Sequence, residues 1–220
     1  MGGSHHQHNH SHDHEHSHFG GTPHSHEHSH DHENVGGDMI NLQGLMGAGV
    51  DPHLYKASAG DVTKLAEADV IFYNGLHLEG KLVEVFEKME SSTKTQVALG
   101  ERLSTSGLIG SDYFASNYDP HVWFNIQYFK EFVEGVVETL SRKDTENASQ
   151  YRANGDAYLK KLSALEDEIK GIVELLPKEK RILVTAHDAF NYFGKSYDFA
   201  NVSLARQSDP LLYSRWRNLA

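Results

Sequence analysis

Three histidines outside the N-terminal region have the type and setting to bind a metal ion. His53 and His121 each end an Asp-Pro-His tripeptide that precedes a stretch of helical pattern. Because proline restricts its own φ and the residue before it, each tripeptide is a stiff loop that fixes the direction of the imidazole. His187 follows the apolar run 183–186, at the expected carboxyl end of a strand, where ligand sites gather in open α/β sheets. One such histidine alone is more often a surface or capping residue, but three together predict a shared metal site.

The residues around these histidines have supporting roles in this interpretation. Asp51 and Asp119 precede the two prolines, and each either caps the following helix or hydrogen-bonds the histidine ring. His77 lies in the segment Asn-Gly-Leu-His-Leu-Glu, and we interpret it as a structural or supporting residue instead of a ligand.

A second concentration of histidine lies at the N-terminus, where residues 1–34 contain 13 of the 17 histidines. The segment 10–18 is repeated at 24–32, with serine and acidic residues between the histidines. Few apolar residues accompany them, so we predict a His-rich metal tract that is disordered when metal-free. The leader Met-Gly-Gly-Ser favours a purification tag as the alternative, whereas the interleaved acids favour a natural tract. No signal peptide is predicted, because a basic start and an apolar segment are both missing.

Composition excludes several classes of protein. The chain has 31 acidic and 20 basic side chains and a formal charge of −11, which argues against a general nucleic-acid binder. It has no cysteine, so disulfides and thiolate metal sites are excluded. No apolar run approaches the roughly 18–20 residues that a membrane span needs.

The rest of the chain alternates short apolar strands with amphipathic helices, which predicts an α/β fold of βαβ units over parallel sheets. Strands are expected over residues 70–73, 96–99 and 181–186. Helices are expected over residues 58–67, 78–89, 126–140 and about 144–177. The last helix would be roughly 45 Å long at 1.5 Å per residue, so it spans more than one lobe, and the strand after it needs a second sheet.

The first of these helices has a specific start signal. Ser58 and Asp61 have capping-box spacing, and the helix is expected to bury Val62, Leu65 and Ala66. At the other end of the chain, from about Asn201 onward, no periodicity continues.

Four motifs closely resemble the solute-binding proteins of metal ABC importers, the zinc and manganese cluster with treponemal, zinc-uptake and pneumococcal adhesin members. They are residues 46–55, 74–79, 119–124 and 185–190. The resemblance implies two α/β lobes with parallel sheets, joined by a long linking helix, with the metal held between them. It implies that His53, His121 and His187 are metal ligands. Histidine at the third position is more like the zinc-type members, and manganese is the alternative, since Mn²⁺ prefers carboxylate oxygen.

The same resemblance implies a function without catalysis. We expect a monomeric, high-affinity receptor in the periplasm, or an extracytoplasmic lipoprotein, that delivers Zn²⁺ or Mn²⁺ to an ABC permease in the membrane. One alternative is a metal buffer or chaperone in which the His-rich tract binds the ions. Another is a zinc hydrolase, because three histidines leave a coordination position for water, although no HExxH motif or general base is found.

The resemblance also predicts the organisation of the chain. The expected parts are the tract 1–34, an N-terminal lobe 35–143, the linking helix 144–177, and an incomplete C-terminal lobe 178–220 with an atypical tail. In the family a first strand would precede Val35, and most of the second lobe would follow with a fourth ligand, commonly Asp. We therefore expect a chain truncated at both ends, and we assign no fourth ligand.

Overall fold

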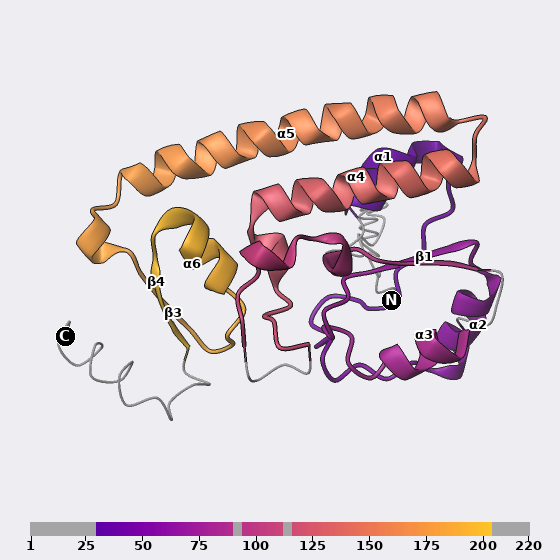
Figure 1. Cartoon of the computed structure of the whole chain (residues 1–220), viewed down its shortest axis with the longest axis horizontal. Helices are drawn as coiled ribbons and strands as arrows, with labels where there is room; N and C mark the ends of the chain where they lie inside the picture. Colours follow the sequence, from indigo (N-terminus) through magenta and orange to yellow (C-terminus); the bar gives the residue numbers. More distant parts are fainter. Residues whose placement is uncertain (1–29, 90–93, 112–115, 204–220) are drawn as a thin grey trace, which may run out of the picture.

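A computed structural model of the chain describes residues 30–89, 94–111 and 116–203. Three helices form one layer: α1 (His30–Gly36), α4 (Ile126–Lys143) and α5 (Ala148–Glu174). Figure 1 shows that α5 runs along the length of the molecule, with α4 beside its first half. The other helices are α2 (Ala59–Glu67), α3 (Val83–Met89) and α6 (Asn191–Tyr197). Short 3-10 turns occupy η1 (Gly37–Met39), η2 (Gly100–Arg102), η3 (Thr105–Gly107), η4 (Val122–Phe124) and η5 (Lys178–Lys180).

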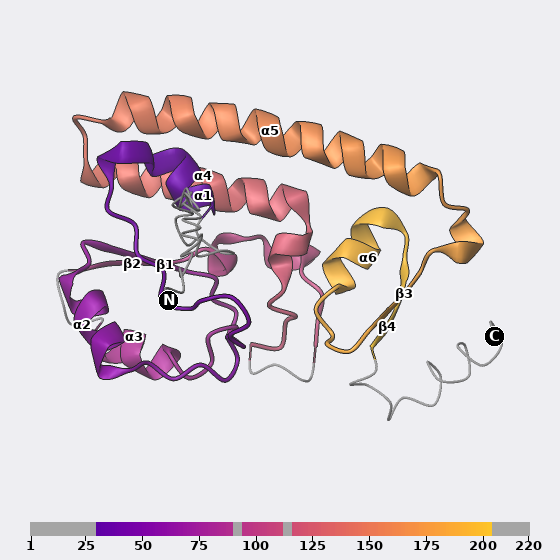
Figure 2. The same cartoon turned by 180° about the vertical axis from the view of Figure 1, so that it is seen from behind.

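Two separate parallel sheets lie on one side of α5, towards its opposite ends (Figures 1 and 2). The first pairs β1 (Val70–Tyr73) with β2 (Thr95–Ala98). The second pairs β3 (Ile182–Thr185) with β4 (Ala200–Ser203). The predicted parallel pairing is confirmed, and so is the second sheet that the strand after the long helix needed.

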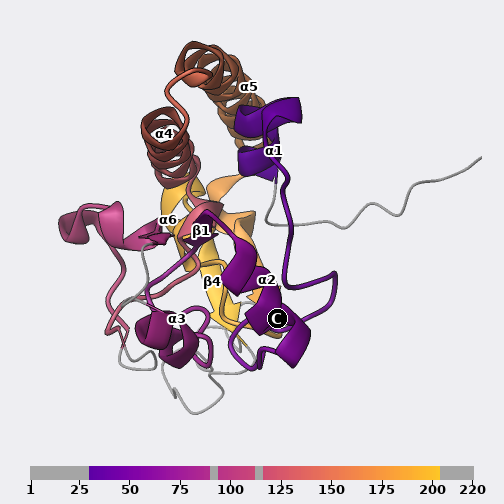
Figure 3. The same cartoon turned by 90° about the vertical axis from the view of Figure 1, so that its right-hand side faces the viewer.

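The first sheet is covered on both faces, as the buried strands of an α/β protein require. On one face a hydrophobic cluster joins it to the helical layer, and Val133, Val136 and Tyr151 are almost fully buried there. On the other face a smaller cluster holds Leu65, Ile71, Leu82 and Phe86. Figure 3 shows the helices on the two faces of this sheet, with α4 and α5 on one side of β1 and α2 and α3 on the other.

Helix α2 begins as predicted but buries less than predicted. Asp61 N–H donates to Ser58 Oγ at 3.2 Å, and Ser58 N–H donates to Asp61 Oδ2 at 2.8 Å, which confirms the capping box. The Asp61 carboxylate also accepts from the hydroxyls of Ser58 and Tyr55, and these two bonds, with the one from the Ser58 N–H, lower the pKa of Asp61 to about 2. Leu65 is buried, but Val62 is 44% exposed and Ala66 is also exposed, so that prediction was wrong for two residues. A helix of nine residues at the margin of the sheet packs against it along one narrow stripe.

Helix α1 includes the last residues of the predicted His-rich tract. Residues 30–34 belong to α1, because the buried Val35 anchors this helix against α4 and α5. Asn154 Nδ2 also donates to the Val35 carbonyl at 2.9 Å. Residues 30–34 thus form the start of α1, whereas the sequence predicted a tract up to residue 34 that is disordered when metal-free. Residues 1–29 lie outside the described residues.

Other element boundaries also differ from the predictions. Helix α5 begins at Ala148, not near residue 144, because the Asp144 side chain accepts hydrogen bonds from Asn147 and from Tyr151 Oη. Strand β4 was not predicted. Its four residues alternate apolar and polar side chains, which is a weak signal over so short a segment, and the pairing with β3 defines the strand. The atypical tail, residues 204–220, lies outside the described residues.

Candidate metal centre

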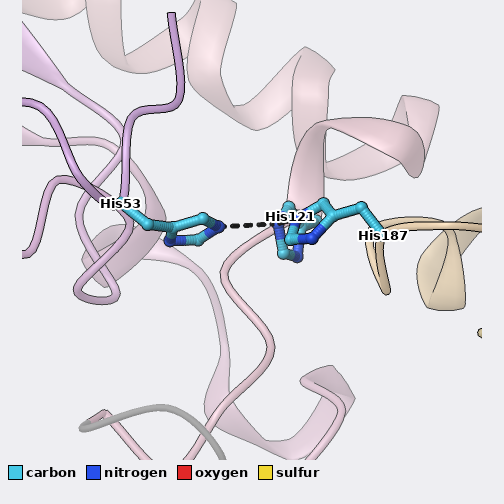
Figure 4. Close-up of side chains that lie close together, drawn as sticks. All are labelled: His53, His121 and His187. Carbon is cyan, nitrogen blue, oxygen red and sulfur yellow. Dashed lines mark hydrogen bonds between the residues drawn. The ribbon is translucent and has the colours of Figure 1, made fainter. Parts of the chain in front are cut away.

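The structure brings together the three histidines that the sequence singled out (Figure 4). His53 comes from the loop before α2, His121 from the turn before η4, and His187 from the end of β3. The Nε2 atoms of His53 and His121 are 3.2 Å apart, and those of His187 and His121 are 3.1 Å apart. All three candidate ligand atoms lie within 4.8 Å of one another.

These distances suit one bound cation. Zinc binds imidazole nitrogen at about 2.0–2.1 Å, which places the ligand nitrogens of a tetrahedral site about 3.3 Å apart. The Nε2–Nε2 separations of 3.2 and 3.1 Å are close to that value, so an ion between the rings requires only small side-chain movements. Three histidines on one side of an ion also leave coordination positions for another ligand or water.

His121 is the best-supported member of the cluster. Its side chain is 2% exposed, and its ring Nδ1 lies 2.7 Å from Oδ1 of Asp119, which is itself fully buried. A carboxylate accepts hydrogen bonds, so this contact places a proton on Nδ1 and leaves the lone pair on Nε2 for a metal. Of the two roles that the sequence left open for Asp119, the structure therefore assigns the ring partner.

Two hydrogen bonds that involve the backbone support His53. The backbone of Leu78 hydrogen-bonds the His53 ring. Asp51 Oδ1 accepts from the His53 backbone N–H at 2.9 Å, so the exposed Asp51 stabilises the turn. Burial and the neighbouring His121 lower the pKa of His53, which keeps its imidazole neutral and ready to bind a cation.

The loop 74–79 packs beside the histidine cluster. The sequence singled out this segment as a motif but did not predict its hydrogen bonds. Two consecutive residues, Leu76 and His77, have positive φ values of 53° and 59°. The buried Glu79 carboxylate holds this loop by accepting from the backbone N–H groups of residues 74 and 75, and burial raises its pKa. Asn74 Nδ2 donates to the Pro120 carbonyl at 3.0 Å, which links the loop to the His121 turn.

His77 is exposed and stays outside the histidine cluster of the described residues, in agreement with its structural interpretation. Sequence reasoning missed Glu79 and Asn74 as supports of the site. The Asn-Gly pair at 74–75 and the acidic residue four positions later were the available signals, because Asn-Gly marks a turn.

Helix α6 joins the second sheet to the His121 turn. Its Tyr192 is fully buried. The Tyr192 hydroxyl donates to the Asp119 carbonyl at 3.0 Å and accepts from the Ile109 N–H at 3.0 Å. Because α6 follows His187 by four residues, this contact places the third histidine beside the other two. No pattern in the sequence indicated this contact.

Comparison with known proteins agrees with this arrangement. The family model described as the periplasmic zinc-uptake complex component A matches residues 30–210, most of the chain and all three histidines. The chain belongs to this family. The resemblance predicted from four short motifs is therefore confirmed over most of the length of the described structure.

Within the zinc-uptake component A family, two curated relatives are similar to this chain. The zinc-binding protein TroA of Treponema pallidum is 42% identical over 166 residues, 76% of this chain and 53% of TroA. The manganese-binding lipoprotein MntA of Bacillus subtilis is 41% identical over 166 residues, 76% of this chain and 54% of MntA. The chain thus spans about half the length of these relatives.

A solved structure supports the fold of the zinc-uptake component A family. The periplasmic zinc-binding protein TroA of T. pallidum superposes with a TM-score of 0.75 and 37% sequence identity, covering 86% of this chain and 69% of TroA. The expected fold class is confirmed: an α/β solute-binding protein of the two-lobed type, with parallel strands and long helices, present here in part.

Proposed function

We propose that this chain is the metal-binding part of an ABC-importer receptor, with a divalent cation as its cargo. The observation that carries this proposal is the convergence of the Nε2 atoms of His53, His121 and His187. Three separate loops supply the three rings, and the fold holds them within ligand distance of one another. Membership of a solute-binding family supports a cargo role over a catalytic one, so we propose no enzymatic activity.

The position of the cluster suits capture and release. His121 is buried, His53 is half-buried and His187 is exposed, so the cluster opens to solvent on the His187 side. The ligands come from segments next to both parallel sheets. We propose that each sheet belongs to one lobe, residues 35–143 and residues 178–220, and that the helix 144–177 links the two lobes. A change in the angle between these parts would change the ligand spacing and thus the affinity.

We propose zinc as the preferred ion and manganese as the alternative. Imidazole nitrogen suits Zn²⁺, whereas Mn²⁺ prefers carboxylate and water oxygen. The Asp119 carboxylate beside the cluster already accepts a hydrogen bond from the His121 ring. The named ions of the two relatives, zinc for TroA and manganese for MntA, agree with this pair of candidates.

The proposed partner is a membrane permease, and the proposed location is extracytoplasmic, with the chain acting as a monomer. One relative is named a lipoprotein and one neighbouring structure is named periplasmic, which supports this location. In the part of the chain that the structure describes, no helix has both the length and the apolar character to cross a membrane.

The direct test is a calorimetric titration of the full chain with zinc and, separately, with manganese. We expect one tight zinc site, lost in His53→Ala and in His187→Ala. If neither ion binds tightly, or if both variants keep the tight site, the receptor proposal is wrong. Tight binding of manganese with weak binding of zinc would overturn only the preference for zinc.

Acid should weaken the tight site. Bound imidazoles must be neutral, and protons compete with the metal for Nε2. Affinity is therefore expected to fall below about pH 6.5. Each imidazole of ordinary pKa, about 6.5, loses roughly 25-fold of its neutral form between pH 7 and pH 5, so a site with several such ligands should lose more than about 100-fold in affinity. Because its pKa is lowered, His53 is protonated only at more acidic pH, so its part of the loss of zinc affinity occurs at lower pH. Zinc titrations across this range test the expectation, and unchanged affinity at pH 5 would contradict histidine ligation.

A metal buffer is the second candidate function, because residues 1–29 contain 11 of the 17 histidines. Removing these residues should lower the number of zinc ions bound and leave the affinity of the tight site unchanged. Calorimetry on the full and shortened chains measures both quantities. Loss of all zinc binding on removal would instead support the buffer and contradict the receptor.

A further inference from the structure

Asn191, the first residue of α6, hydrogen-bonds two acidic residues that lie beside the histidine cluster. Its Nδ2 donates to Asp119 Oδ2 at 2.8 Å and to Asp188 Oδ1 at 3.1 Å. Asp119 is the carboxylate that holds the His121 ring, and Asp188 is the residue after His187. One amide group therefore connects the support of one candidate ligand to the neighbour of another.

The chemistry of an amide suits this position. Its NH₂ group has two hydrogens and no charge, so it can serve two carboxylates at once. Hydrogen bonds to ionised acceptors are stronger than those between neutral groups. Without this donor, the Asp119 and Asp188 carboxylates would repel each other, which would weaken the contact between the segments that carry them.

The contact also crosses between the two halves of the structure. Asn191 follows the β3 strand, whereas Asp119 lies on the turn that leads into η4 and α4. The Asn191 side chain also lines a cavity of about 490 Å³ together with Lys195 and Asn201. Water can occupy the space that a shorter side chain would leave, so the fold is expected to survive truncation at this position.

We propose that Asn191 is a positioning residue for the metal site, which holds His187 against His121 and slows the release of the bound ion. This inference rests on the proposed metal-binding function. It predicts that the amide donor matters and the volume of the side chain does not. Asn191→Asp keeps the shape but replaces the donor with a third carboxylate, so it should disturb the site at least as much as Asn191→Ala.

The test compares zinc release from the full chain and its variants. Each protein is loaded with one equivalent of zinc, and transfer to an excess of a chromogenic chelator is followed by stopped-flow absorbance. The matched control is Asn154→Asp, the same substitution at a partly buried asparagine on α5, whose Nδ2 donates to the Val35 carbonyl. Visible spectra with Co²⁺ in place of zinc report the ligand geometry, and thermal unfolding reports the fold.

We expect both Asn191 variants to release zinc up to about 10-fold faster. This is the low end of the range of about 10–100-fold for a direct hydrogen-bond partner of a metal ligand, because Asn191 acts through Asp119 and Asp188. The cobalt bands of Asn191→Asp should differ from wild type, while Asn154→Asp keeps wild-type release and spectrum. Wild-type release from both Asn191 variants, a larger effect of Ala than of Asp, or equal acceleration in Asn154→Asp would each overturn the inference alone. Absence of a tight zinc site in the unsubstituted chain would overturn the proposed function and this inference with it.

Discussion

His121→Ala should abolish tight zinc binding by this chain. The substitution removes the central ring of the cluster, whose Nε2 lies 3.2 Å from that of His53 and 3.1 Å from that of His187. Losing a partner behind a ligand costs about 10–100-fold in metal affinity, so losing the ligand itself should cost more than about 100-fold. Competition against a zinc chelator of known affinity measures the change.

The matched control for this variant is His77→Asn. His77 is an exposed histidine outside the cluster, and asparagine tolerates its positive φ of 59°. This variant should keep the affinity of the unsubstituted chain. Because alanine at position 121 also leaves the buried Asp119 without its ring partner, circular dichroism must confirm that the variant is folded. A folded His121→Ala protein with full affinity would rule out the histidine site.

Asp119→Asn should weaken zinc binding while every proposed ligand stays in place. The fully buried carboxylate accepts from the His121 ring at 2.7 Å, from the His121 N–H at 3.0 Å and from Asn191 at 2.8 Å. An amide retains one acceptor oxygen, but it turns an NH₂ group towards the His121 ring or towards Asn191, where another donor already lies. We expect zinc affinity to fall about 10–100-fold. The free energy of unfolding should fall by about 1–3 kcal/mol.

Asp51→Asn is the internal comparison for this prediction. Asp51 occupies the same place in the other Asp-Pro-His tripeptide, and its carboxylate accepts from the His53 backbone N–H at 2.9 Å. It is exposed, so its amide variant can be hydrated. We expect zinc affinity within about twofold of wild type and a smaller loss of stability. Similar losses in both variants would show that Asp119 acts through the turn and not through the ring.

Much of the fold was predictable because the signals were local. The apolar runs at 70–73 and 182–185 are short, and the stripes of α4 and α5 have helical spacing, so each element could be located within a few residues. The capping box is likewise a local signal, because it depends on two residues three positions apart, Ser58 and Asp61. Strand β4 and helix α1 were missed, because pairing with β3 and burial of Val35 create them.

The sequence by itself determined which histidines were candidates, since Asp-Pro-His stiffens two loops and the end of a strand presents the third. Only the tertiary structure decided that His53, His121 and His187 meet, and that Asp119 contacts a ring while Asp51 does not. The identical tripeptides differ in burial, which no local pattern encodes. The supports at Glu79, Asn191 and Tyr192 likewise arise from contacts between distant segments. Spacing along the chain reports local conformation, whereas the geometry of a site depends on packing between elements far apart in sequence.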